Sequence, residues 1–194
     1  MLKTLLLLLF AYLLGSVPVG VLVAEWFNGN DPRHSGSGNI GATNVARTAG
    51  KKAGIITLCG DCLKGLLAVL AARACGAGDG LLAFTGFVAF LGHLYPIFIG
   101  FKGGKGVATA LGILLAIAPL PTLAGIVLFA AVAGISHFVS LGSITAAAAM
   151  PLFLCQAGYN WKIVYTALLM AVFIIYRHRD NIMRLCQKTE NRFF

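Results

Sequence analysis

The chain has 194 residues, of which 59% are hydrophobic and 11% are charged, with a formal net charge of +9 and a mean hydropathy of +0.88. Soluble domains carry about 25% charged residues, so this composition excludes an ordinary water-soluble fold and predicts a protein of the lipid bilayer. The positive charge is typical of a membrane surface. Nucleic acid is not expected as a partner, because the chain has no soluble domain and no basic strand interleaved with aromatic residues.

Seven apolar stretches follow one another along the chain. Several are shorter than the roughly 20 residues that a bilayer core requires, so flanking residues must lengthen those helices. The fourth and fifth are separated by Pro119-Leu120-Pro121, which predicts a tight turn because proline lacks an amide donor and restricts the residue before it. The sequence therefore predicts an all-α integral membrane protein with about seven transmembrane helices in a single domain, residues 1–194. The stretches are 2–24, 54–74, 80–100, 107–120, 121–139, 143–158 and 161–176.

The first stretch begins as a signal peptide would, with Lys3 followed by a run of leucines. It then continues through Gly15, Pro18 and Gly20 without a cleavage site of small residues, and it leads directly into a polar loop. We therefore interpret it as the first membrane helix.

A polar island at residues 33–52 follows this helix. Its glycines let the backbone approach a ligand closely, and Ser37, Asn39, Thr43 and Asn44 supply short hydrogen-bonding groups. Arg47 adds positive charge. A predominantly apolar chain has little reason to keep such a segment unless it binds an anion, so the island predicts an anion-binding loop.

Two features of the second apolar stretch invite a functional interpretation. Cys59 and Cys62 have the spacing of a metal-binding pair, but no second pair completes a zinc site, so we interpret them as packing residues. Asp61 and Lys64 lie three positions apart and can pair on one helix face. Charge at membrane depth marks either a functional site or an internal brace, and we expect the pair to brace the neighbouring polar loop.

A second island spans residues 92–109. Lys102 and Lys105 bracket Gly103 and Gly104, and Gly106 precedes a helix whose first amides and positive dipole end favour an anion. The segment is not a Walker loop, because Ile99 replaces its first glycine and Gly106 its hydroxyl residue. A phosphate-binding loop is the preferred interpretation, and a basic interfacial turn is the alternative.

A third polar island lies at residues 177–184. The predicted orientation in the membrane rests on all three islands. With an odd number of helices and the N-terminus outside, all three islands lie on the cytoplasmic side and the C-terminus is cytoplasmic. Eleven Lys and Arg residues then lie inside and three outside, as the positive-inside rule requires, while Lys64 lies within a helix.

The sequence offers no good nucleophile-and-base pair. Ser37 and His34 lie three residues apart in a glycine-rich loop, with no evident carboxylate to orient the histidine. None of the four histidines has an aspartate five positions later, the spacing that many glycerolipid acyltransferases use. An acyl transfer by this chain would therefore need a donor that is already strongly activated.

Two other classes of function fit less well. An anion transporter would place its polar groups near the membrane midplane on paired repeats, and no internal repeat is visible. A phosphotransferase acting on nucleotide-activated alcohols would need an aspartate-rich metal motif, whereas the six acidic residues are scattered singly.

Taken together, the three islands resemble one family. The segments that carry the resemblance are SGSGNIGATNVAR at 35–47, GHLYPIFIGFKGGKGVAT at 92–109 and HRDNIMR at 178–184. Supporting matches are GSVPVG at 15–20, DCLKG at 61–65 and SLGS at 140–143. In this order, over nearly the whole chain, they resemble the bacterial acyl-phosphate-dependent glycerol-3-phosphate acyltransferases, the PlsY family. The tail after Arg184 adds nothing to the resemblance.

The resemblance implies a multi-pass enzyme of the bacterial cytoplasmic (inner) membrane with its active site on the cytoplasmic side. It would transfer a fatty acyl group from acyl phosphate to the 1-hydroxyl of sn-glycerol 3-phosphate, giving lysophosphatidic acid and inorganic phosphate in the first step of phospholipid biosynthesis. No cofactor and no metal are implied. A soluble acyl-carrier-protein-dependent phosphate acyltransferase would supply the acyl phosphate.

The resemblance also implies the site residues. Lys105 and the amides of Gly103, Gly104 and Gly106 are expected to hold the acyl phosphate, and Arg47, His178 and Asn181 the glycerol phosphate. Further candidate substrate-binding residues are Asn39, Thr43 and Asn44, which would shape the first loop, together with His93 and Lys102. The catalytic set implied by the family is Ser37, Arg47, Lys105, Ser143, His178 and Asn181.

Overall fold

The computed structural model describes residues 1–192, and every regular element in that range is a helix. The chain divides into two compact units, Met1–Ile117 and Ala118–Phe194, and each is described by itself. The single domain expected from the sequence therefore stays a prediction.

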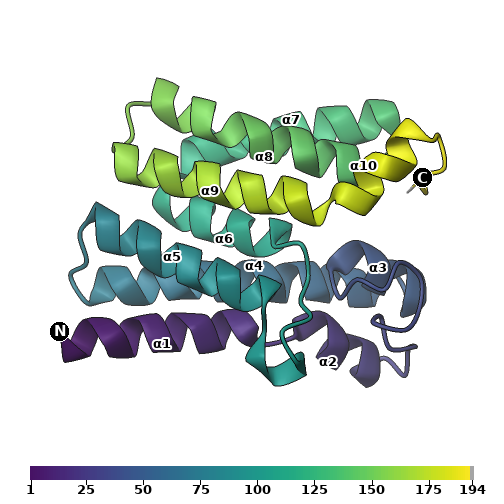
Figure 1. The fold of residues 1–194 in the computed structure, drawn as a ribbon, viewed down its shortest axis with the longest axis horizontal. Coiled ribbons are helices and arrows are strands. Elements are labelled where there is room, and N and C mark those ends of the chain that lie inside the picture. The colour runs from purple at the N-terminus through teal and green to yellow at the C-terminus, as the bar shows by residue number, and fades with distance from the viewer. Residues whose placement is uncertain (193–194) are drawn as a thin grey trace. The chain divides into compact units, whose positions relative to one another are not determined.

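The N-terminal unit is built around α4 (Lys51–Ala74). This helix packs against α1 (Leu2–Ser16), α2 (Val19–Trp26), α3 (Ala42–Thr48), α5 (Asp79–Leu94) and α6 (Val107–Ile117). Figure 1 shows α1, α4 and α5 running side by side, with α2 and α3 gathered at one end of the unit. The short 3₁₀ helix η1 (Ile97–Ile99) lies in the loop between α5 and α6.

Glycines allow the helices of this unit to approach one another closely. Gly15 of α1 faces the carbonyl of Ala89 in α5, and Gly112 of α6 faces the carbonyl of Cys62 in α4. A Cβ atom at either glycine would overlap those backbone atoms. Since lipid gives no hydrophobic drive between helices, close van der Waals packing of this kind is a main source of association in a membrane.

The first apolar stretch is broken where the sequence predicted one continuous helix. α1 ends at Ser16 and α2 begins at Val19, because Pro18 cannot donate a backbone hydrogen bond. The two helices together still form one apolar segment, Leu2–Trp26, that is long enough to cross a bilayer.

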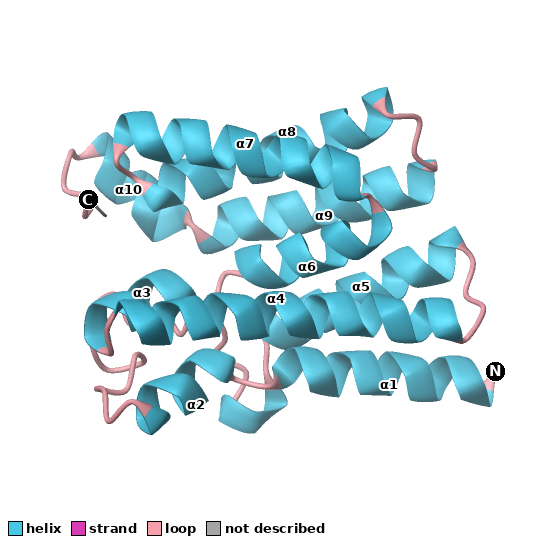
Figure 2. Cartoon of the chain, turned by 180° about the vertical axis from the view of Figure 1, so that it is seen from behind, coloured by secondary structure: helices cyan, strands magenta, loops and turns pink. Residues whose placement is uncertain are grey.

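The C-terminal unit contains α7 (Pro119–Ser136), α8 (Val139–Gln156), α9 (Trp161–Arg177) and α10 (Arg179–Cys186). α8 packs against both α7 and α9, and α10 continues from α9 after a bend of 57°. Figure 2 shows these helices from behind with their connecting loops. The predicted break near Pro119 is confirmed, but both prolines lie in the first turn of α7, where their missing amides would have no helical partner.

Within residues 1–192, five helical segments are long and apolar enough to cross a membrane, or six if α9 and α10 count as one bent span. The remaining apolar helix, α6, has 11 residues and is shorter than a full span. The all-helical membrane fold expected from the sequence is confirmed, whereas the count of seven spans and the sides of the two termini stay predictions.

Candidate active site

The first polar island folds around the side chain of one residue, Asn44. Its Nδ2 donates to the carbonyls of Pro32, Ser35 and Asn39 at 2.9, 3.0 and 2.9 Å. Its Oδ1 accepts from the backbone N–H of Ser37 at 2.8 Å. The amide is buried and engaged at both ends, so Asn44 shapes the loop. A direct role of Asn44 in binding substrate stays a prediction.

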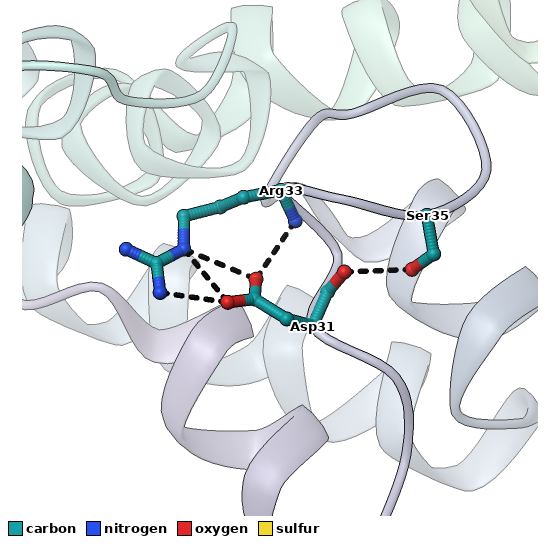
Figure 3. A network of polar contacts seen from close by, with 3 residues as sticks. All are labelled: Asp31, Arg33 and Ser35. Carbon is teal, nitrogen blue, oxygen red and sulfur yellow. Dashed lines mark hydrogen bonds and ion pairs between the residues drawn. The ribbon is translucent and has the colours of Figure 1, made fainter.

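The same loop is closed at its start by a local ion pair, drawn in Figure 3. Arg33 donates from Nε and Nη2 to the carboxylate of Asp31, with the shortest contact at 2.7 Å, and Ser35 Oγ donates to the Asp31 carbonyl. The hydrogen bonds from the Arg33 guanidinium lower the pKa of the Asp31 carboxyl. Arg33 is thus engaged with its own loop, which leaves Arg47 as the better candidate to meet an anion.

Ser37 and Arg47 are exposed. The N–H of Ser37 is held by Asn44, and Arg47 lies in the last turn of α3, a helix that the sequence did not predict. Thr43, in the first turn of α3, is half-buried, and Asn39 accepts from the Gly41 N–H at 2.8 Å. The Ser37 hydroxyl and the Arg47 guanidinium therefore come from an island with a defined backbone.

The second island packs against the C-terminal end of α5. The N–H of Gly103 donates to the carbonyl of Leu94 at 3.1 Å, and that of Gly104 to the carbonyl of His93 at 3.2 Å. This corrects the expectation that these two amides hold an acyl phosphate, because both serve the last carbonyls of a helix. The glycines are needed for close approach, since a Cβ on Gly103 would overlap the His93 carbonyl.

Lys105 and Gly106 follow directly and lead into α6. Gly106 has a φ of +83° and faces the ring of Phe90, so both its conformation and its surroundings require glycine. Lys105 is half-buried, whereas Lys102 is exposed. The chain thus delivers Lys105 to the N-terminal end of α6, where the helix dipole favours an anion.

Three charged or titratable side chains lie buried beneath this loop. Asp61 Oδ1 is 2.7 Å from Nζ of Lys64 and 3.4 Å from Nδ1 of His93. Lys64 also donates to the carbonyl of Val17 at 2.9 Å, at the break between α1 and α2. The pair predicted from the sequence is present, and His93 is buried with it rather than exposed to a ligand.

In the C-terminal unit, His178 lies between α9 and α10 and is buried. Its Nδ1 is 2.7 Å from the carbonyl oxygen of Ile174. Because a carbonyl can only accept, Nδ1 carries the hydrogen, and the neutral ring has its lone pair on Nε2. The backbone therefore orients the ring of this histidine through Nδ1.

Asn181 belongs to a network that the sequence did not reveal. Its Nδ2 donates to Oε1 of Glu190 at 2.6 Å, Ser140 Oγ donates to the same oxygen at 2.9 Å, and Arg184 Nε donates to Oε2 at 2.7 Å. Glu190 lies beyond Arg184, where the family resemblance ends, so the sequence prediction does not include it. Its rarity, as one of six acidic residues, was the available signal.

Glu190 has a lowered pKa, and the cause lies in this network. Partial burial raises the pKa, but the hydrogen bonds from Asn181, Arg184 and Ser140 favour the carboxylate and outweigh that effect. The ionised network therefore stabilises the fold above the ordinary pKa of 4.5, and the stabilisation is lost as the pH falls through the lower folded value.

The pH dependence of this stabilisation predicts the behaviour of a variant with a neutral side chain at position 190. We expect Glu190→Gln to lower the thermal unfolding midpoint at pH 7, because a charge-assisted bond to Arg184 is lost. The difference in unfolding midpoint between wild type and variant should become smaller below about pH 4.5, because the wild-type carboxylate is then protonated. Thermal unfolding in detergent between pH 3 and pH 8 measures this difference, and a gap that is constant with pH would contradict the prediction.

Ser143 lies within α8 and is buried. Its Oγ donates to the carbonyl of Val139 at 2.9 Å, one turn earlier in the same helix. Each unit therefore holds part of the predicted catalytic set. Ser37, Arg47 and Lys105 belong to the N-terminal unit, and Ser143, His178 and Asn181 to the C-terminal unit.

Comparison with known proteins gives one consistent result. Residues 5–188 match the family model for glycerol-3-phosphate acyltransferase. The glycerol-3-phosphate acyltransferase of Geobacter sulfurreducens is 53% identical over 100% of this chain and 99% of its own length. That of Aquifex aeolicus is 46% identical over 98% of this chain and 100% of its own.

Two solved structures are similar to this chain and come from the same family. The crystal structure of PlsY, an integral membrane glycerol 3-phosphate acyltransferase, in its glycerol 3-phosphate form has a TM-score of 0.94 and 45% identity, covering 99% of this chain and 96% of that one. The lysophosphatidic acid form has a TM-score of 0.88 at the same identity, covering 98% and 95%. With these matches and the helices described above, the chain belongs to the glycerol-3-phosphate acyltransferase family and is an integral membrane acyltransferase.

Proposed function

We propose that this enzyme transfers a fatty acyl group from acyl phosphate to the 1-hydroxyl of sn-glycerol 3-phosphate. The observation that carries the choice of donor is the setting of His178. Its Nδ1 donates to the backbone carbonyl of Ile174, so in this contact no carboxylate raises its basicity. A histidine whose Nδ1 is held by a neutral carbonyl favours a donor that is already activated, and a carboxylic-phosphoric anhydride carries a good leaving group.

In the proposed reaction, the glycerol phosphate hydroxyl oxygen attacks the acyl carbonyl carbon. The bond from that carbon to the phosphate oxygen breaks, giving lysophosphatidic acid and inorganic phosphate. The hydroxyl proton passes to an oxygen of the departing phosphate. The protein then has mainly to position two anions and stabilise the developing oxyanion. Lys105 and Arg47 are the cations proposed for this role.

The roles of the remaining residues follow from their settings. Nε2 of His178 is proposed to accept a hydrogen bond from glycerol phosphate, and Asn181 to support the same end of the site. Ser37 contributes a hydroxyl from the first loop, and Ser143 a hydroxyl from α8. A soluble acyltransferase that draws on acyl carrier protein is the proposed source of acyl phosphate, since the donor hydrolyses readily and needs a dedicated supply.

The decisive experiment compares donors. Purified enzyme is supplied with glycerol 3-phosphate and with palmitoyl phosphate, palmitoyl-CoA or palmitoyl-acyl carrier protein, and lysophosphatidic acid is measured. We expect product with the acyl phosphate. Activity with the thioesters alone would show that the proposed donor is wrong.

The proposed location in the bacterial cytoplasmic membrane has its own test. We expect single cysteines at Thr48, Phe101 and Thr189, in a variant without its five native cysteines, to be protected from an impermeant thiol reagent in intact cells. Thr48 and Phe101 lie within polar islands predicted to be cytoplasmic, and Thr189 follows the third island. Labelling should appear after permeabilisation, which serves as the control. Labelling of any of them from outside would contradict the orientation.

His178 distinguishes substrate positioning from general base catalysis. If Nε2 positions glycerol phosphate, His178→Gln should keep a polar group near that atom and raise the KM for glycerol phosphate while some kcat remains. His178→Asn, whose amide lies nearer to Nδ1, should retain less. If His178 were the base, both should lower kcat by about 10²- to 10⁴-fold with little change in KM.

The pH profile completes this test. A histidine base would impose an acid limb near its own pKa, about 6.5 if unperturbed, and the limb would vanish in both variants. Substrate phosphate also titrates near pH 6, so only the response of the limb to mutation is informative. We expect the limb to survive.

A further inference from the structure

We propose that Asp61 is a positioning residue for acyl transfer, and that it acts through His93 on the Gly103–Lys105 segment that carries the phosphate-binding lysine. This inference rests on the proposed function. Asp61 is buried and does not reach the substrate. Its role is to hold His93, which in turn supports the loop from beneath.

Three side chains of this cluster are almost completely buried. Asp61, Lys64 and His93 are 2%, 4% and 3% exposed. Lys64 already neutralises Asp61 at 2.7 Å and is anchored to the Val17 carbonyl. The pair therefore needs no histidine for charge balance, yet Nδ1 of His93 lies 3.4 Å from the same Asp61 oxygen. This contact between α4 and α5 favours the ring direction in which Nδ1 of His93 faces Asp61.

The His93 ring lies against the loop that leads to Lys105. A Cβ atom on Gly104 would overlap Nε2 of His93, so the ring edge lies directly against the Gly104 backbone. The carbonyl of His93 also accepts from the Gly104 N–H at 3.2 Å, and the next carbonyl, of Leu94, accepts from Gly103 at 3.1 Å. Both the ring and the backbone of His93 therefore contact the segment that immediately precedes Lys105.

The position of Lys105 affects the rate of the proposed reaction. Two anions must meet in the proposed reaction, and the lysine that holds one of them must lie in the right place before the attack. A misplacement of about 1 Å, caused far from the reacting atoms, can cost about 10²-fold in rate. Rotation of the His93 ring would withdraw the support under Gly104 and shift the adjoining Lys105. Asp61 prevents that rotation.

The test uses the Asp61→Asn/Lys64→Gln double variant, because neutralising both partners avoids leaving one buried charge unpaired. Measured with palmitoyl phosphate and glycerol 3-phosphate, its kcat/KM for the acyl phosphate should fall about 10- to 100-fold, while the KM for glycerol 3-phosphate stays within about twofold. Thr85→Val is the matched control. Thr85 is equally buried in α5, but its hydroxyl bonds to Leu81 of its own helix, so activity should be retained.

A mutant cycle shows whether the effect passes through His93. His93→Gln should lower the same kcat/KM, and adding the Asp61/Lys64 changes to it should cost little more, since the supported residue is already absent. Wild-type kinetics in the double variant, additive losses in the triple variant, or a loss that only follows a lower unfolding midpoint would overturn the inference. If wild-type enzyme used no acyl phosphate, the proposed function itself would fail, which is a separate result.

Discussion

Replacing Lys105 with alanine is expected to abolish nearly all acyl transfer while leaving the amount of folded enzyme unchanged. Lys105 is half-buried, follows a backbone segment fixed to α5, and lies where the dipole of α6 favours an anion. Losing a positioned charge that stabilises the transition state costs about 10²- to 10³-fold in rate. Initial rates with acyl phosphate, normalised to folded protein, measure the effect.

Lys102→Ala is the matched control for this change. Lys102 is three residues away in the same loop and is exposed, so its removal alters the local charge equally but should have a much smaller effect on rate. If Lys105→Ala kept more than about a tenth of the wild-type rate, a loss under roughly 1.4 kcal/mol of transition-state stabilisation, the lysine would not be central. Equal losses in both variants would indicate a general surface-charge effect.

Replacing Asn44 is expected to disable the first loop. In Asn44→Ala, three loop carbonyls and the Ser37 N–H lose their partner together. At about 1 kcal/mol for each hydrogen bond, the loss is enough to let the loop leave its conformation. Ser37 would then no longer be held in place. We expect a lower thermal unfolding midpoint and a rate reduced at least about 10-fold, since small misplacements of positioning groups are costly.

Two further variants sharpen this prediction. Asn44→Asp keeps the acceptor for Ser37 but removes both amide hydrogens and sets a carboxylate against the loop carbonyls, so it should be at least as harmful as alanine. Asn39→Ala removes a single bond to the Gly41 N–H and should be mild, with a cost of about 1 kcal/mol. Normal activity in Asn44→Asp would show that the amide donors do not hold the loop.

The class of protein and the positions of its polar islands could be predicted from the sequence. Hydropathy and charge are sums over neighbouring residues, so they need no knowledge of the fold. The break near Pro119 follows in the same way, because proline acts on its own helix. Pro18 breaks the first apolar stretch for the same local reason. The sequence is apolar on both sides of Pro18, so it predicts one continuous helix where the structure has two.

Only the tertiary structure decided which groups the polar residues meet. Lys64 bonds to Val17, 47 residues away, and Ser140 to Glu190, 50 residues away. Such partners depend on how helices pack, and no periodicity in the sequence records them. The same holds for Gly103 and Gly104, whose composition suggested a phosphate cradle. Their amides donate to α5 instead, because the ends of a buried helix also need partners for their carbonyls.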